Sequence, residues 1–292
     1  MALIPPFFLD CTVAIGFDAP DGHRQYAATG FLYGRFLKQE GESKTYQVFL
    51  VTNKHVFEGA SLAWLRFNPE GDETAKEFDL NLFDSNGKQI WLAHPDSDVD
   101  LAVVRLSVGF LKEQGVRFNY FRSDQHIANR KRALDLGFSE GDSIFVLGFP
   151  MGLVGEKRNF VIVRQGAIAR IRDSLSGNSK EILIDTFIFP GNSGGPVVTK
   201  PEVISIEGTK AVSSAYLIGV VTAYVPYRDV AVSTQTNRPR VIFEENSGLA
   251  SVVPIDYVID IIETASKTLK EGGEETPVET IQGGSPESAG YR

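Results

Sequence analysis

The chain contains a single cysteine, Cys11, among its 292 residues, so no disulfide bond can form within it. A composition without disulfides is typical of a reducing compartment. The first ten residues include two prolines and no basic residue, so they do not resemble a signal peptide. The sequence therefore predicts a cytoplasmic protein.

Long apolar runs and an excess of positive charge are also missing. No apolar stretch approaches the roughly 18 residues that a membrane-spanning helix needs. The formal net charge is −8, whereas a nucleic-acid surface needs a basic stripe. The dense basic cluster Arg130-Lys131-Arg132 is interpreted as part of a solvated connector. We expect neither a membrane nor a nucleic acid as partner and, since no cluster of metal-ligating residues occurs, neither a metal ion nor a cofactor.

The sequence does contain many short segments rich in Val, Ile, Phe and Tyr, each bounded by Gly, Asp, Asn or Pro. This pattern is typical of short β-strands. Two sets of about six such segments predict an all-β fold of two six-stranded antiparallel β-barrels with a C-terminal helix, because closure removes exposed strand edges. The expected strands are residues 12–17, 27–36, 46–52, 62–67, 78–83 and 101–106, then 143–148, 160–171, 181–187, 196–199, 216–225 and 249–253.

The domain boundaries follow from the polar stretches. We expect an N-terminal barrel over residues 1–125 and a C-terminal barrel with its helix over 126–270, joined through a connector within 114–137. Residues 271–292 have almost no aliphatic side chains and are predicted to be a disordered tail. The helix is predicted behind Pro254 from apolar residues at helical spacing, namely Ile255, Val258, Ile259, Ile262 and Leu269.

The strongest local motif is Pro190-Gly191-Asn192-Ser193-Gly194-Gly195-Pro196. A serine hydroxyl becomes an effective nucleophile only when a base takes its proton and the developing oxyanion is stabilised. The glycine two residues before Ser193 allows the N–H groups of Gly191 and Ser193 to converge on one point. The alternative is a tight glycine-rich turn with an incidental serine.

A candidate base follows another apolar segment. Phe49-Leu50-Val51-Thr52-Asn53-Lys54-His55 delivers a histidine at the end of a predicted buried strand. His23, His94 and His126 lie instead in polar turns, loops or the connector. A lone histidine is usually structural, and this reading stays open for His55.

A candidate acid precedes the segment that begins at Leu101. Asp100 adjoins this apolar strand and can be buried at its edge, where a carboxylate would accept the second imidazole N–H of the histidine. Asp98 and Asp96 are alternatives in the preceding turn. The order His, Asp, Ser along the chain is that of the chymotrypsin arrangement and differs from the subtilisin and α/β-hydrolase orders.

With these motifs in place, the chain resembles the trypsin-like serine proteases in their HtrA/Deg form over most of residues 10–265. Weaker resemblances support this in sequence order: Thr29-Gly30-Phe31, Gly141 to Pro150, Gln165-Gly166-Ala167-Ile168, Ile218 to Thr222 and Gly248 to Pro254. The resemblance implies a serine endopeptidase acting on a protein or peptide substrate.

The resemblance also implies a role for each matching position. Ser193 would be acylated, His55 would shuttle the proton and Asp100 would hold His55. The amides of Gly191 and Ser193 would form the oxyanion hole. Thr222, Ala223 and Tyr224 would pair with the substrate as an added strand.

Several features depart from the family pattern. Asn192 replaces the aspartate of many secreted members, so the ion pair made on zymogen activation is not expected. No PDZ domain is seen after Lys270, so the family's substrate tethering and cage assembly are not assumed. Phe187 and Phe189 flank the expected specificity pocket and Asp185 is the only nearby acid, which favours aliphatic over basic residues.

Two rival interpretations remain. A catalytically silent binding module could keep the fold. An active chain could be a housekeeping protease or a dedicated effector that requires a regulatory protein partner. An esterase would require a Gly-x-Ser-x-Gly elbow, and Gly191-Asn192-Ser193-Gly194-Gly195 is one residue out of that register.

Overall fold

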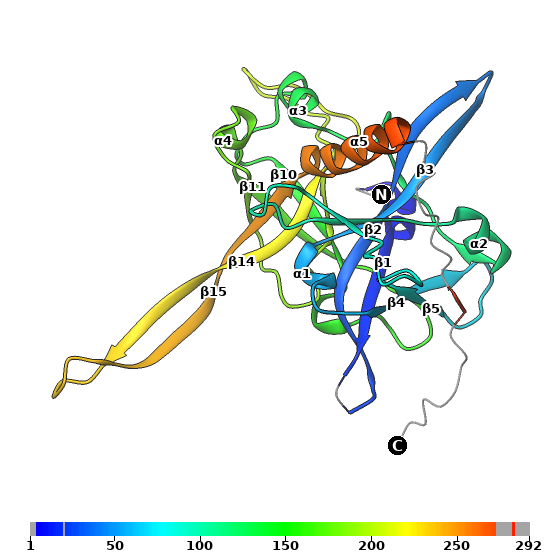
Figure 1. Cartoon of the computed structure of the whole chain (residues 1–292). Coiled ribbons are helices and arrows are strands. Elements are labelled where there is room, and N and C mark those ends of the chain that lie inside the picture. Colours follow the sequence, from blue (N-terminus) through cyan, green and yellow to red (C-terminus); the bar gives the residue numbers. More distant parts are fainter. Residues whose placement is uncertain (1–3, 20, 273–281, 284–292) are drawn as a thin grey trace.

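Two β-sheets, one from each half of the chain, dominate the computed structural model, which describes residues 4–19, 21–272 and 282–283 (Figure 1). The first sheet runs in the order β16-β5-β4-β1-β2-β3-β7-β6, with β8 added on β4 and β9 on β2. Its strands are β1 (Thr12–Asp18), β2 (Arg24–Glu40), β3 (Ser43–Thr52), β4 (Leu62–Pro69), β5 (Lys76–Asn81), β6 (Leu92–Ala93), β7 (Ala102–Arg105), β8 (Val116–Arg117), β9 (Phe121–Arg122) and β16 (Gln282–Gly283).

The second sheet closes into a barrel in the order β10-β11-β12-β15-β14-β13. Every neighbouring pair in this barrel is antiparallel, as predicted. The strands are β10 (Ser143–Gly148), β11 (Ile162–Arg170), β12 (Ile182–Asp185), β13 (Pro196–Thr199), β14 (Leu217–Val232) and β15 (Pro239–Pro254).

The predicted fold class is confirmed, since the chain has the chymotrypsin-like combination of two β-units and a C-terminal helix. The first unit differs in detail. It is an open sheet that curves as a half-barrel, and β9 pairs with β2 in parallel, so it is neither closed nor purely antiparallel. The extra short strands β6, β8, β9 and β16 extend the pairing beyond the expected six.

Several loops between the strands contain short helices. The predicted connector forms β8, β9 and a helix that starts at the basic cluster, where the Asn129 side chain caps the first turn by accepting from the Arg132 N–H. The helices are η1 (Pro6–Cys11), α1 (Lys54–Phe57), α2 (Val108–Glu113), α3 (Arg130–Leu136), η2 (Pro150–Gly152), α4 (Arg172–Leu175) and α5 (Ile255–Gly272). None of the helices among the described residues is long and apolar enough to span a membrane.

Burial on both faces explains why the C-terminal part of β3 is a continuous apolar run. Val48 and Leu50 face the core inside the first sheet, whereas Phe49 and Val51 face a second cluster between the two halves. Successive side chains of a strand point to opposite faces, so a strand buried on both faces loses the polar alternation. The strand that precedes His55 is therefore fixed by two cores at once.

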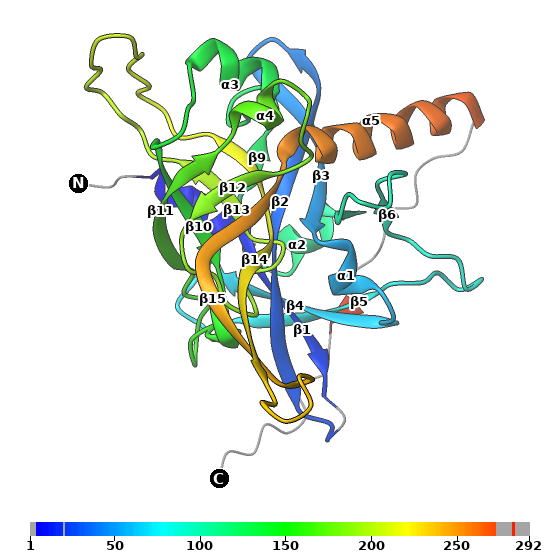
Figure 2. The same ribbon diagram turned by 90° about the vertical axis from the view of Figure 1, so that its left-hand side faces the viewer.

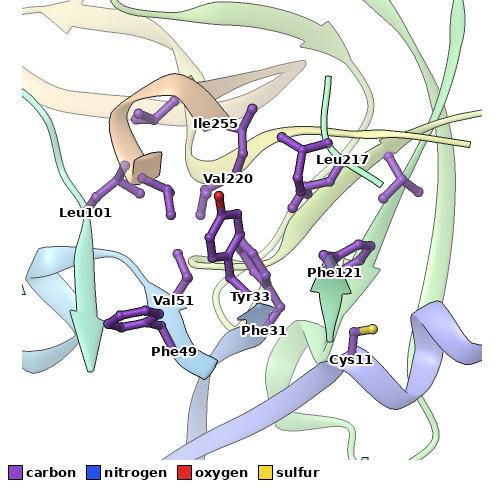
Figure 3. Packing of buried hydrophobic residues seen from close by; sticks show 14 of the residues in the cluster. Cys11, Phe31, Tyr33, Phe49, Val51, Leu101, Phe121, Leu217, Val220 and Ile255 are labelled. Atoms are coloured by element: carbon purple, nitrogen blue, oxygen red, sulfur yellow. The ribbon is translucent and has the colours of Figure 1, made fainter. Parts of the chain in front are cut away.

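The cluster between the halves joins strands of both sheets with the C-terminal helix (Figure 3). Phe31 and Tyr33 of β2 meet Leu217 and Val220 of β14 there, and Ile255 begins the helix. The helix α5 leaves β15 and returns over β6 and β7 of the first sheet (Figure 2). The two halves thus share one buried interior at the level of the candidate site.

The predicted helix is confirmed in its position and in its buried face. Ile255, Val258 and Ile262 are buried, and Ile259 is partly buried against the same cluster. The side chain of Leu269 lies outside the described side chains. Most of the predicted tail, residues 271–292, also lies outside the described residues. Its first two residues, Glu271 and Gly272, are the end of α5, and Gln282–Gly283 pairs with β5. The division into domains stays a prediction.

The largest difference from the expected strands is the length of β14 and β15. Their sequence pattern predicted strands only over residues 216–225 and 249–253. In the structure both continue for 16 residues and form a two-stranded hairpin that projects away from the barrel (Figure 1). We call its projecting part, residues 225–246, the arm.

Ile262→Ala tests the contribution of α5 to the shared interior. Ile262 is 1% exposed, so its truncation leaves a cavity, and we expect a loss of about 2–4 kcal/mol in the free energy of unfolding. Asp260→Ala, at an exposed position of the same helix, should change it by less than about 0.5 kcal/mol. Denaturant unfolding measures both; equal small effects would show that the helix is not part of the core.

Candidate active site

His55 lies at the rim of the first sheet, where the chain leaves β3 and enters the one-turn helix α1. The neighbouring Val56 and Phe57 are buried in the first core, while the His55 side chain stays 48% exposed. Asn53, immediately before the helix, is fully buried, and its Nδ2 donates to the Asp100 carbonyl oxygen at 2.8 Å. This contact ties the end of β3 to the segment that leads into β7.

Asp100 is joined to His55 by two hydrogen bonds. Its Oδ1 accepts the His55 backbone N–H at 2.9 Å, and its Oδ2 lies 2.6 Å from the His55 Nδ1. Burial alone would raise the pKa of the Asp100 carboxyl, but the hydrogen bonds from the His55 ring and from the backbone N–H groups of His55 and Lys54 outweigh it and keep that pKa below its usual value. A carboxylate only accepts, so Nδ1 carries a proton and Nε2 of a neutral ring keeps its lone pair.

The two alternative acids lie elsewhere. Asp96 and Asp98 both pair with the ammonium group of Lys180, at 2.6 and 3.0 Å. Asp98 accepts no hydrogen bond from His55 among the described residues. The geometry thus favours Asp100 over both alternatives as the residue that orients His55.

Ser193 follows a tight turn in the loop between β12 and β13. The Asn192 N–H donates to the Phe189 carbonyl at 3.0 Å, and Gly191 has a φ of +97° at the third position of this turn. Proline in second place and a glycine with positive φ in third place define a type II turn. The Asn192 side chain closes it, because its Oδ1 accepts the Phe189 N–H at 3.0 Å.

The turn orients the peptide group between Pro190 and Gly191. The Pro190 carbonyl accepts the Met151 N–H at 2.6 Å, so the N–H of the same peptide group, which belongs to Gly191, points the opposite way. Within the described part of the chain neither the Gly191 N–H nor the Ser193 N–H has a hydrogen-bond acceptor. Two unpaired N–H groups two residues apart are the donors an oxyanion hole requires.

Thr29 of β2 ties this loop to the first sheet. Its N–H donates to the Ser193 carbonyl at 2.9 Å, and its hydroxyl donates to the Gly191 carbonyl at 2.6 Å. The Thr29 carbonyl in turn accepts the Thr52 hydroxyl at 2.8 Å, and Thr52 is the last residue of β3. We call these three hydrogen bonds the threonine seam. The seam places the serine loop against the end of the strand from which His55 follows.

Gly194 makes this close approach possible. Its φ is +82°, and a Cβ atom there would lie 2.1 Å from the Thr29 carbonyl oxygen and 2.2 Å from the Thr52 hydroxyl. No side chain fits at such distances, and L-residues also disfavour the left-handed backbone. The glycine after Ser193 is therefore required by the seam between the halves.

The Ser193 hydroxyl donates to the Thr222 carbonyl oxygen at 3.2 Å. Among the described contacts no hydrogen bond joins Ser193 to His55. A neutral hydrogen bond of this kind contributes about 1 kcal/mol net. The hydroxyl is thus held beside β14 in this conformation.

The residues predicted to bind substrate lie on one strand edge. β13 pairs with β14 up to Pro196 and Val220, and the preceding Gly194 and Gly195 make backbone hydrogen bonds to Val221. Beyond Val221 only β15 pairs with β14 among the described strands. Thr222 lies at a bulge, and its hydroxyl donates to the Ser251 carbonyl at 3.1 Å. Ala223 is exposed, and Tyr224 donates through its hydroxyl to Glu244 at 2.7 Å. The edge from Thr222 to Tyr224 is open to an additional strand.

Phe187 and Phe189 differ in their surroundings. Phe187 is 51% exposed beside Gly248, whose φ is +84°. Phe189 is partly buried, and the Arg164 guanidinium carbon lies 5.3 Å from the centre of its ring. An aromatic face is available at Phe187, whereas the Phe189 ring is engaged by a cation.

Sequence reasoning missed two residues of this site. Thr29 is a fully buried polar residue within an apolar strand, and this mismatch was a signal that its hydroxyl needs partners. Met151 adopts a φ of +56°. The sequence does not predict this conformation, because positive φ is typical of Gly, Asn or Asp and uncommon for Met.

The comparisons with known proteins place the chain in a family. Residues 28–203, more than half of the chain, match the trypsin-like peptidase domain, and the match includes His55, Asp100 and Ser193. The chain therefore belongs to the family of trypsin-like peptidase domains. β14, β15 and α5 lie beyond the matched segment.

Among solved structures, the apo crystal structure of the MamO protease domain from Magnetospirillum magneticum is similar to the chain. The identity is 13%, the alignment covers 87% of this chain and 97% of that domain, and the TM-score is 0.46. No curated protein matches the sequence.

Comparison of Gly194→Ala with Gly208→Ala separates the steric effect of the close approach at the threonine seam from the effect of a positive φ. Both glycines have a φ near +83°, but a Cβ atom at Gly208 would meet nothing within 4 Å. We expect Gly208→Ala to lower the free energy of unfolding by about 1 kcal/mol through its backbone conformation alone. Gly194→Ala should lower it by more than about 3 kcal/mol. Denaturant unfolding compares the two, and equal losses would contradict a steric role for Gly194.

Proposed function

We propose that the chain is a serine endopeptidase in which Ser193 forms an acyl-enzyme, His55 transfers the proton and Asp100 orients His55. The observation that supports it best is the two-point contact of the Asp100 carboxylate with the backbone N–H and the ring Nδ1 of His55. A surface histidine with a merely structural role does not need its ring fixed in this way. Fixing the tautomer leaves Nε2 to accept the serine proton.

The reaction would begin with rotation of the Ser193 hydroxyl from the Thr222 carbonyl towards the imidazole. Attack on a peptide carbonyl carbon then forms the Oγ–C bond as the proton passes to His55 Nε2. The negative charge that develops on the carbonyl oxygen would be stabilised by the N–H groups of Gly191 and Ser193. Asp100 would stabilise the imidazolium, which next protonates the leaving amine, and water would hydrolyse the acyl-enzyme by the reverse proton path.

A polypeptide substrate suits the open edge of β14. Strand addition supplies main-chain hydrogen bonds that do not depend on substrate sequence, so Thr222, Ala223 and Tyr224 would bind an extended backbone. The exposed aromatic ring of Phe187 supports an apolar specificity pocket. We propose cleavage after small or medium aliphatic residues.

The hydrogen bond from Ser193 to Thr222 favours one alternative, a silent peptide-binding module that keeps the same strand edge. In such a module the serine would stay on the Thr222 carbonyl and the unpaired N–H groups would bind a substrate carbonyl without chemistry. The two functions differ in whether Ser193 is activated. Substitution of Asp100 tests this difference.

Asp100→Asn is expected to lower kcat for an aliphatic peptide substrate by about 10⁴-fold, because an amide can present N–H to Nδ1 and stabilise the wrong tautomer. KM should change little. Asp98→Asn is the matched control in the neighbouring turn, and it should alter kcat by no more than about twofold because Asp98 contacts Lys180. If Asp98→Asn inactivates the protein while Asp100→Asn does not, the assignment is wrong.

Met151 provides a test of the oxyanion hole through backbone conformation. Its N–H holds the Pro190 carbonyl, and its φ of +56° is unfavourable for any residue with a Cβ atom. Met151→Gly keeps the N–H and removes this cost, so kcat should be equal or higher. Met151→Val disfavours the conformation, and kcat should fall by about tenfold.

In both variants KM should stay near that of the unmodified protein, since the pocket and the edge of β14 are unchanged. Steady-state kinetics and thermal unfolding on the same samples give the comparison. Equal losses in the glycine and valine variants would show that the Met151 side chain matters and that its backbone conformation does not.

A further inference from the structure

The arm continues the edge of β14 away from the candidate active site (Figure 1). Beyond the barrel its two strands pair only with each other among the described residues, from the pair Tyr227 and Glu245 to the pair Val232 and Pro239. A two-stranded ribbon has two solvent-facing sides and no interior of its own, and on its own it is only marginally stable. The chemical character of its exposed side chains therefore indicates the kind of partner that the arm binds.

Large apolar side chains are exposed on both sides of this ribbon. Val230 faces Ile242 across the strands, and the next pairs along, Asp229 with Phe243 and Ala231 with Val241, lie on the opposite side. The exposed fractions are 60% for Tyr227, 43% for Val230, 53% for Val232, 50% for Val241, 63% for Ile242 and 55% for Phe243. Such a concentration marks a binding surface.

The direction of a bound chain follows from β13. This strand runs antiparallel to β14, and its chain enters from Ser193 through Gly194 and Gly195, which make backbone hydrogen bonds to Val221. A strand that occupies the vacant edge beyond Val221 in the same direction as β13 has its C-terminal end at Ser193. The part of a substrate that lies N-terminal to the scissile bond then runs outward along β14 to the arm.

We propose that the arm is an exosite for an extended apolar segment of the substrate polypeptide, N-terminal to the scissile bond. The proposal rests on the proposed function, because it takes Ser193 as the point where the bond is cut. Val230 lies eight positions after Thr222, or about 26 Å along the strand. The outer arm therefore contacts substrate residues about eight to ten positions before the bond.

The mode of binding changes along the edge. Pro226 has no N–H to donate. A bound strand therefore cannot form both backbone hydrogen bonds with this residue, and regular pairing along the edge of β14 ends after Tyr224. The base of the arm is held instead by Glu244, whose carboxylate accepts from Arg228 at 2.8 Å and from Tyr224 at 2.7 Å. The outer arm is thus an apolar surface that selects side chains.

The charge of the arm is balanced. Residues 225–246 include three basic residues, Arg228, Arg238 and Arg240, and three acidic residues, Asp229, Glu244 and Glu245. Apolar contact therefore selects the bound segment, and the chemistry that fits is a β-branched or aromatic segment.

The test uses Ser193→Ala protein and two fluorescent peptides. Both contain the same four residues before the bond, and the long one carries eight further residues rich in Val, Ile and Thr at its N-terminus. We expect the long peptide to bind about tenfold more tightly by fluorescence anisotropy. The arm variant Val230→Thr, Ile242→Thr and Phe243→Thr keeps residues that favour strands, and it should lose this gain.

The matched control carries Val203→Thr, Ile204→Thr and Ile206→Thr, three exposed aliphatic residues in the loop between β13 and β14 that are 69%, 77% and 75% exposed. It should keep the full gain. Equal affinities for the two peptides, an equal gain in the arm variant, or a gain only when the eight residues are added at the C-terminus overturns the proposal. A dimer in light scattering that the arm substitutions dissociate, without any effect on the peptides, assigns the arm to a second copy and also overturns it.

Hydrolysis by protein with Ser193 intact separates this proposal from the proposed function. If the short peptide is cleaved and the arm variant retains the same preference for the long peptide, the function stands and the exosite is wrong. If neither peptide is cleaved but the arm still governs affinity for the long one, the exosite stands and the endopeptidase function is wrong.

Discussion

The threonine seam is the constraint on which the rest of the candidate site depends. Thr29 in the first sheet holds the carbonyl groups of Gly191 and Ser193, which belong to the second barrel, and Thr52 holds Thr29 from the end of β3. His55 follows β3 three residues later. One set of buried hydrogen bonds therefore fixes the position of the serine loop relative to His55, and the shared core of Phe31, Val51 and Val220 joins the same two halves.

Two further hydrogen bonds orient the N–H groups of Gly191 and Ser193, the proposed oxyanion donors. The Pro190 carbonyl shares a peptide group with the Gly191 N–H and accepts from Met151, and the Asn192 carbonyl shares one with the Ser193 N–H and accepts from Gly195, so neither peptide group can turn without losing a hydrogen bond. Asn192 contributes through its Phe189 contact and requires no ionised partner. The loop is thus organised by backbone contacts that need no charge pair formed at a new N-terminus.

The motifs around His55, Asp100 and Ser193 could be recognised from the sequence because each lies where an apolar strand meets a short polar or glycine-rich segment. The terminal helix was equally visible from its apolar spacing. The length of the arm was not, because its apolar residues form only two short runs, Val230 to Val232 and Val241 to Phe243, in a ribbon without a buried face. The threonine seam could not be predicted, since a threonine in an apolar strand indicates that its hydroxyl needs partners but does not identify partners more than 150 residues away in the chain, such as Gly191. The additional pairing in the first sheet could not be predicted either. It involves short segments such as β9, whose two residues are too few to show a hydrophobic period.

Activation of Ser193 distinguishes an endopeptidase from a silent binding module, and covalent labelling measures this activation. A fluorophosphonate probe reacts with a serine only when a base accepts its proton and N–H donors stabilise the charged intermediate. We predict one probe per chain, attached at Ser193 as located by peptide mass spectrometry, in the isolated protein without an added partner. Folded protein that stays unlabelled, or that is labelled at another serine, would contradict the account and leave the silent binding module as the function.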